Sequence, residues 1–266
     1  MKKKIFNRDQ MEQIHIGLVQ GLDVTQYTQL DPQGHPIFND NQMDEIRKGL
    51  KKGLDVSKYN QIDHDGYPIF NWGQMYVIRE GLEHGLDISQ YTQLDLKGHP
   101  IYDFWQMEQI RIGLEHGLDI SIYAKQNNFN RPIYDCLQMS EIREGLEHGL
   151  DISQYSQLDH KGRPIFNRGQ MSEIREGLEH GLDISQYNQL DPQGHPIFNG
   201  YQMYAIRKGL EQGLDISQYT HLASKSSLSD FDKTPTDLKD SKVINEYNKS
   251  SHTPSDTQSK SHSLTK

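Results

Sequence analysis

The sequence predicts a mainly α-helical solenoid built from seven 32-residue units. A Gln-Met pair recurs at constant spacing, with its methionines at Met11, Met43, Met75, Met107, Met139, Met171 and Met203. Residues 139–155 and 171–187 are identical letter for letter. A fixed period of this length is the signature of a repeat protein, in which each unit buries its apolar face against its neighbours.

The first element of each unit is an expected helix of about 13 residues, illustrated by the second unit. Asn39 is a good N-cap, Met43, Ile46 and Leu50 share one helical face, and Gly53 suits the left-handed residue that ends a helix. Equivalent caps predict helices that start near residues 7, 39, 71, 103, 135, 167 and 199.

A glycine in the middle of each helix is unfavourable by about 1 kcal/mol relative to alanine. Gly49 is the example in the second unit. We expect a neighbouring helix to approach closely at this bare Cα, because such an approach would offset the cost.

The second element of each unit is a short helical turn followed by a tight loop. Asp55 can cap the turn, with Val56 and Tyr59 directed inward. The loop that leads into the second unit, residues 30–38, contains Asp-Pro-Gln-Gly. This pattern predicts a type I turn with Gly34 in the left-handed region, as a small hairpin or an ordered loop. The fourth unit has Asn130 at the glycine position, and asparagine tolerates the same conformation best.

The composition divides the chain into an array over residues 1–221 and a tail over residues 222–266. The tail is rich in Ser, Thr, Lys and Asp, as is typical of disordered segments. A short helix that caps the last unit is the alternative, and it would use Phe231, Leu238, Val243, Ile244 and Tyr247.

Charge and cysteine content limit the function classes. The array carries a formal charge of −10 and the tail +1, which gives −9 for the chain. An acidic array argues against binding to nucleic acid or to an anionic membrane. The single cysteine, Cys136, excludes a disulfide framework. The basic start has no apolar run behind it, so we expect a cytoplasmic protein.

Arginines recur once per helix and suggest a ladder of ion pairs between units. They are Arg47, Arg79, Arg111, Arg143, Arg175 and Arg207, with His15 at the first position. The expected partners are Asp55, Asp87, Asp119, Asp151, Asp183 and Asp215. An anion-binding row is the functional alternative, and we favour the structural interpretation because every unit carries both halves of the pair.

Other reactive side chains are interpreted as structural. Glu-His pairs precede the terminal glycine of four helices, at His84, His116, His148 and His180, and predict a solvated stripe rather than a metal site. Asp63-His64-Asp65-Gly66 predicts a turn rather than a calcium loop. Cys136 lies in a first helical turn, where a thiolate is favoured, but no partner histidine recurs near it, so we expect an inert thiol.

The candidate binding surface lies where the units differ from one another. Large aromatic residues occur at otherwise variable positions, namely Trp72, Tyr76, Phe104, Trp105 and Tyr204. Variable positions of a solenoid usually face outward, and aromatic residues there predict a contact surface. Packing of these side chains against the preceding loop is an equally good interpretation.

The core pattern Gln-Met-x-x-Ile-Arg-x-Gly-Leu-x-x-Gly-Leu-Asp-(Val/Ile)-Ser-x-Tyr resembles short helical repeats in uncharacterised proteins of low-GC Gram-positive bacteria and their mobile elements. The resemblance covers about half of each unit across residues 10–219. It implies a bacterial setting and no established activity.

The sequence therefore predicts a non-enzymatic protein-interaction module with a protein partner and neither cofactor nor metal. The alternative is an acidic decoy that competes for the basic groove of a nucleic-acid-binding protein. A metal-dependent enzyme is the third and least favoured class.

Overall fold

The computed structural model of the protein describes residues 5–216 and divides them between two compact units. The first unit runs to Ile152 and includes Leu158–Pro164. The second comprises Ser153–Gln157 and the chain from Ile165 onward. The predicted tail, residues 222–266, lies outside the described residues.

Residues 5–216 form a helical repeat without β-strands, which confirms the predicted fold class. The 12-residue α-helices are α1 (Arg8–Val19), α2 (Asp40–Lys51), α3 (Trp72–Glu83), α4 (Phe104–Glu115), α5 (Cys136–Glu147), α6 (Arg168–Glu179) and α7 (Gly200–Glu211). Short 3₁₀ helices follow them: η1 (Val24–Gln26), η2 (Val56–Lys58), η3 (Ile88–Gln90), η4 (Ile120–Ile122), η5 (Ile152–Gln154) and η6 (Ile184–Gln186).

Both ends of each helix follow from local sequence. The Asn39 side chain accepts a hydrogen bond from the backbone N–H of Gln42, and the Gln42 side chain accepts one from the Asn39 N–H. Such a capping box satisfies two of the backbone donors that a helix start leaves free. Gly53, with a φ of +70°, ends the helix in the left-handed region as predicted.

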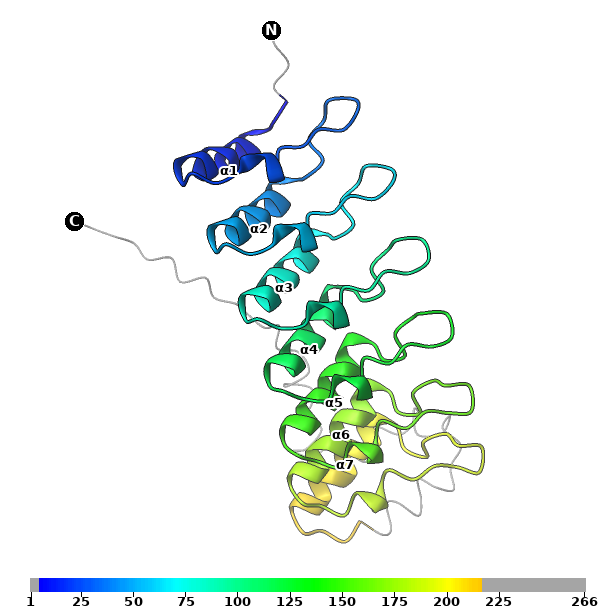
Figure 1. The fold of residues 1–266 in the computed structure, drawn as a ribbon. Helices are drawn as coiled ribbons and strands as arrows, with labels where there is room; N and C mark the ends of the chain where they lie inside the picture. Colours follow the sequence, from blue (N-terminus) through cyan, green and yellow to red (C-terminus); the bar gives the residue numbers. More distant parts are fainter. Residues whose placement is uncertain (1–4, 217–266) are drawn as a thin grey trace, which may run out of the picture. The chain divides into compact units, whose positions relative to one another are not determined.

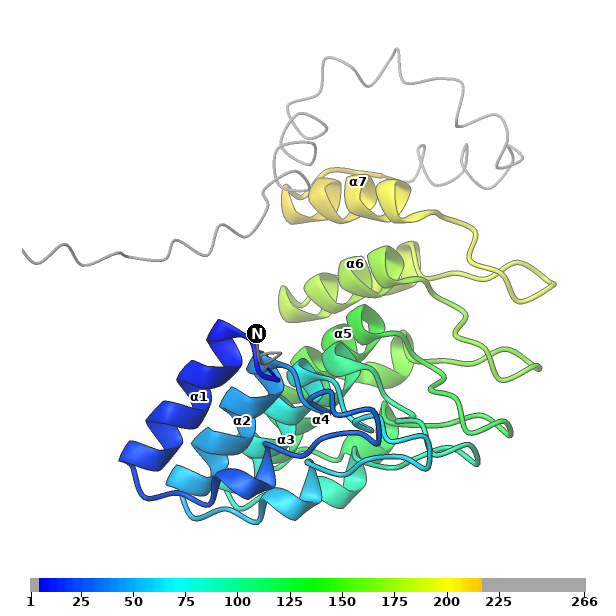
Figure 2. The same ribbon diagram turned by 90° about the horizontal axis from the view of Figure 1, so that it is seen from above.

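Consecutive helices pack in tandem within each unit. In the first unit α1 to α5 contact one another in order, and in the second unit α6 contacts α7. Figures 1 and 2 show the helices of the first unit side by side, with the loops extending beyond their N-terminal ends. The methionines of the repeat are fully buried in this core from the second helix onward, at Met43, Met75, Met107, Met139, Met171 and Met203.

The glutamine of the Gln-Met pair ties each repeat to the next. Gln42 Nε2 donates to the backbone carbonyl of Phe70 at 3.0 Å, and Gln10 makes the same bond to Phe38 at 2.8 Å. One buried side chain therefore completes a capping box and also joins two repeats.

The structural reason for the glycine in the middle of the helix differs from the one expected. A Cβ on Gly49 would overlap the hydroxyl oxygen of Tyr59 and lie 3.1 Å from Val56 Cγ1. Both side chains come from the same repeat, where η2 folds back under α2. The expectation of a close neighbouring helix was therefore wrong.

The loops after the 3₁₀ helices are small closed structures. A single antiparallel bridge joins Leu30 to Pro36, and Gly34 has a φ of +80°. Asn130 takes the same region with a φ of 54°, which confirms the predicted turn. The Asp63 loop is also a turn, because its carboxylate accepts the backbone N–H groups of Asp65 and Tyr67, both at 2.9 Å.

Candidate interaction surface

All five aromatic residues predicted to bind a partner lie on helices. Trp72 is the first residue of α3, and Phe104 and Trp105 are the first two residues of α4. Tyr76 lies one turn further along α3, and Tyr204 lies on α7 in the second unit.

Phe104 links the two tryptophan-bearing helix ends. Its ring packs edge-on against Trp105, with the ring centroids 4.6 Å apart. On its other side it covers Gly73 of α3, where an added Cβ would lie 3.0 Å from Phe104 Cδ2. Glycine after Trp72 thus leaves space for the Phe104 ring between α3 and α4.

The two tryptophans remain exposed on this support. Trp72 is 53% exposed and Trp105 is 61% exposed, although large aromatic side chains are usually well buried. Their backbone positions are held by the capping boxes of Asn71 and Asp103. We refer to Trp72, Phe104 and Trp105 as the aromatic surface.

The two tyrosines have a different environment. The Arg79 guanidinium carbon lies 5.4 Å from the Tyr76 ring centroid, and Arg207 has the same distance to Tyr204. Burial, with Glu80 and Glu108 nearby, raises the pKa of Tyr76. Both tyrosines therefore pack over buried arginines rather than joining the aromatic surface, and Tyr204 belongs to the other unit.

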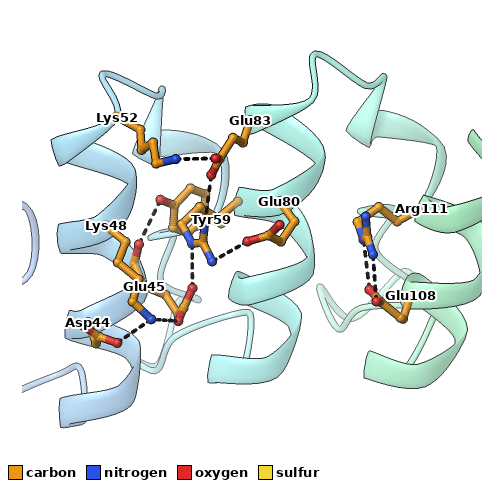
Figure 3. A network of polar contacts seen from close by, with 10 residues as sticks. Asp44, Glu45, Lys48, Lys52, Tyr59, Glu80, Glu83, Glu108 and Arg111 are labelled. Carbon is orange, nitrogen blue, oxygen red and sulfur yellow. Dashed lines mark hydrogen bonds and ion pairs between the residues drawn. The ribbon is translucent and has the colours of Figure 1, made fainter. Parts of the chain in front are cut away.

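The arginine ladder exists between neighbouring helices, but its partners differ from the prediction. Arg79 Nε donates to Glu45 Oε2 on the preceding helix at 2.7 Å, and Arg47 Nε donates to Gln13 Oε1 at 2.9 Å. Figure 3 shows this network between α2 and α3. The predicted partner Asp55 instead caps η2 by accepting the backbone N–H of Ser57.

One exception shows how the ladder works. The residue on α3 equivalent to Glu45 is Val77, which cannot accept a hydrogen bond. Arg111 on α4 therefore turns to its own helix and pairs with Glu108 and Glu115, each at 2.8 Å (Figure 3). Since these guanidinium groups are engaged by carboxylates and largely buried, they do not form a free anion-binding row.

The second unit contains the most buried rung of the ladder. Arg207 is 2% exposed, and its Nε donates to Glu173 Oε2 at 2.7 Å. Burial raises the pKa of Glu173 to about 7, while Arg207 favours the charged carboxylate.

The predicted histidine stripe is half-exposed and links consecutive helices. His84 Nδ1 lies 2.6 Å from Glu115 Oε1, and His116 Nδ1 lies 2.7 Å from Glu147 Oε1. Between residues 5 and 216, no three His, Cys, Asp or Glu side chains are grouped so that they could hold a metal ion.

The surroundings of Cys136 oppose the thiolate form that a first helical turn would favour. The first turn of α5 favours a thiolate in principle. Burial and the nearby Asp103 and Asp135 instead raise the pKa of the Cys136 thiol, so it stays protonated at neutral pH.

Two exposed apolar residues that the sequence analysis did not single out lie at the tips of loops. Leu96 is 99% exposed and Phe129 is 83% exposed. Both replace polar residues or proline found at equivalent positions, such as Pro32 and Lys161. This departure from the repeat could have been noticed in the sequence.

The fold and the aromatic surface define a helical-repeat protein. Comparison of the chain with protein-family models, curated proteins and solved structures finds no match. The resemblance to bacterial short helical repeats therefore stays a prediction. No helix in the described part of the chain has the length and apolar character needed to cross a bilayer.

Proposed function

We propose that this chain is a non-enzymatic protein-interaction scaffold whose aromatic surface docks a protein partner. The observation that carries the proposal is the exposure of Trp72 and Trp105, the only two tryptophans of the chain, on neighbouring helices. Tryptophan is the residue type most enriched among those that dominate binding energy at interfaces.

The support beneath the tryptophans favours tight binding. Phe104 fills the space above Gly73, and the capping boxes hold the helix ends in place. The aromatic surface would therefore lose little conformational entropy when a partner binds, which is the benefit of preorganisation.

The alternative function, an acidic decoy, has less support because several carboxylates of the first unit already pair with arginines. Glu45, Glu80 and Glu83 contact Arg79, and Glu108 and Glu115 contact Arg111. A mimic of the nucleic-acid backbone needs acidic groups that are free to meet basic side chains.

The proposal extends to a cytoplasmic location. With Cys136 as its sole cysteine, the chain forms no internal disulfide and gains nothing from an oxidising compartment.

The test is affinity capture from a bacterial lysate with the full chain as bait, eluted by rising salt. We expect a partner that survives high salt, because apolar contacts are not screened by ions as surface charges are. Purified partner should also change the tryptophan fluorescence, because both tryptophans lie at the proposed contact.

The decisive variant is Trp72→Ala combined with Trp105→Ala, which should weaken binding by about tenfold or more. Leu137→Ala is the matched control, because Leu137 occupies the position of Trp105 on α5 and is 53% exposed. A partner that binds the double variant as well as the parent would refute the aromatic surface. Release of a nucleic-acid-binding partner at modest salt would favour the acidic decoy.

A further inference from the structure

Two neighbouring loops of the first unit enclose an open hollow. Loop 3 (residues 93–101) is closed by the backbone bond from Ile101 N to Gln93 O, and loop 4 (residues 125–133) by the bond from Ile133 N to Lys125 O. The hollow between them has a volume of about 960 Å³ and includes Leu96 and Phe129 in its lining. We refer to it as the loop hollow.

A hydrogen-bond bridge specific to this pair of loops supports the hollow. Gln126 Nε2 donates to Gln93 Oε1 at 2.7 Å and to Tyr102 Oη at 3.0 Å. The Tyr102 hydroxyl in turn donates to the carbonyl of Ala124 at 2.6 Å. The bridge therefore connects the base of loop 3 to the base of loop 4.

Two residues of this bridge, Gln126 and Tyr102, differ from the residues at the same position in most other units. Every other equivalent of Gln126 is leucine or isoleucine, as in Leu94 and Ile62, and these cannot form the bridge. Tyr102 occupies the position of Phe38 and Phe70 in earlier units, and the fifth unit shares the tyrosine as Tyr134. The residues that link loop 3 to loop 4 thus lie at the base of the same two loops that carry Leu96 and Phe129.

The charge of the loop hollow also departs from the repeat. In the loop at residues 157–165, Arg163 pairs with Asp159, with Nη2 and Oδ2 2.8 Å apart. Loop 4 has Asn127 in place of that aspartate, so Arg131 forms no ion pair with any residue between 5 and 216. Lys97 adds a second positive charge to the lining, and Asp95 adds one negative charge. The Asp95 carboxylate already accepts the backbone N–H groups of Lys97 and His99, so the lining stays positive in a chain whose formal net charge is −9.

We propose that the loop hollow binds a short acidic peptide segment that carries a large apolar side chain. The apolar side chain packs between Leu96 and Phe129, and an acidic group pairs with the Arg131 guanidinium. A guanidinium offers a planar fork of donors that fits a carboxylate with two parallel hydrogen bonds. Apolar contact supplies affinity at the centre, and charge complementarity selects acidic over basic peptides.

The test is selection of a displayed library of random short peptides on the immobilised full chain, followed by fluorescence anisotropy with synthetic versions of the enriched peptides. We expect enrichment of sequences that combine Asp or Glu with Leu, Phe or Trp. Enrichment of basic sequences, or no enrichment, would overturn the proposal.

Two variants locate the site. Asn127→Asp gives Arg131 the carboxylate that Arg163 already has, and it should weaken the selected peptides by about tenfold. Phe129→Ser removes one apolar wall and should have a similar effect. Both positions are exposed in a closed loop, so the helical circular dichroism and the thermal transition should match those of the parent protein.

The matched control is Arg163→Ala, which removes an arginine at the same loop position outside the hollow. Equal loss of binding in Arg163→Ala and Asn127→Asp would show a general charge effect and would overturn the assignment. Trp72 and Trp105 do not line the hollow, so this test is independent of the proposed function.

Discussion

The hydroxyl group of Tyr59 occupies the space that a side chain on Gly49 would need. Tyr59 is fully buried, and its hydroxyl donates to the Glu45 carbonyl at 3.3 Å, against the bare Cα of α2. The same pairing recurs in other repeats, for example between Gly81 and Tyr91. In these repeats, glycine in the middle of the helix is therefore required to accommodate the tyrosine of the same repeat.

We predict that Gly49→Ala destabilises the protein although alanine is the better helix former. Overpacking of this kind costs about 1–3 kcal/mol, and the gain in helix propensity offsets about 1 kcal/mol. Removal of the obstructing oxygen by Tyr59→Phe should restore part of the loss. Denaturant unfolding of the parent, the two single variants and the double variant measures this coupling.

Gly169→Ala is the control for this cycle. Gly169 also lies in a helix, but the nearest atom to an added Cβ is Asn167 Oδ1 at 3.5 Å, an ordinary contact. This substitution should therefore leave stability unchanged or raise it. The packing explanation fails if Gly49→Ala is as well tolerated as Gly169→Ala.

Features encoded by a few adjacent residues were predictable from the sequence. The cap at Asn39, the terminal glycine at Gly53 and the left-handed Asn130 each depend on backbone preferences within one turn. The repeat period then extends one local interpretation to all units, which is why the fold class could be derived.

Features that depend on the register between helices were not predictable. Glu45 and Arg79 are separated by 34 residues, and either Asp55 or Glu45 was available in the sequence as a partner. Which carboxylate pairs with Arg79 depends on which face of α2 meets α3. Asp55 is not the partner, because it caps η2. The folding of η2 under its own helix likewise could not be distinguished from approach of a neighbouring helix.

Loss of the buried carboxylate of Glu45 should cost more stability than loss of an exposed carboxylate that makes no ion pair. Glu45 and Arg79 are both less than a tenth exposed, and Glu45→Ala leaves the Arg79 Nε without its acceptor. Arg79 keeps Glu80 and Glu83, so we expect a loss of about 2 kcal/mol, within the range for an unsatisfied buried charged donor. Thermal and denaturant unfolding provide the measurement.

Two matched variants accompany this measurement. Glu12→Ala removes an exposed carboxylate at the position of α1 equivalent to Asp44, where no ion pair forms within residues 5–216, and it should cost less than about 1 kcal/mol. Glu45→Gln keeps an acceptor, as Gln13 does for Arg47, and should lie between the two. Equal effects of Glu45→Ala and Glu12→Ala would contradict the role of the buried pair.

The buried tyrosines predict unfolding at alkaline pH. Burial raises the pKa of Tyr59, Tyr91 and Tyr123 well above the ordinary value near 10, and that of Tyr134 to about 12. Above pH 10 the unfolded chain releases these protons while the folded protein retains them. The folded state therefore loses stability as pH rises through this range.

Absorbance of tyrosinate and circular dichroism, recorded together during an alkaline titration, test this expectation. Part of the tyrosine signal should appear only when helical structure is lost, in one joint transition. Titration of all 14 tyrosines near pH 10 with intact helices would contradict the burial of these hydroxyl groups.

The Asp159 carboxylate predicts a pH effect of the opposite sign. It accepts the backbone N–H groups of Lys161 and Arg163 at 2.8 and 2.9 Å, together with the Arg163 guanidinium. These bonds lower the pKa of Asp159 to about 2. Because the folded pKa lies below the unfolded value near 4, its contribution to stability is present above pH 4 and is lost as pH falls toward 2. Carbon-detected NMR titration should show this midpoint, and Arg163→Ala should raise it, whereas an unchanged midpoint would mean that the guanidinium does not hold the carboxylate.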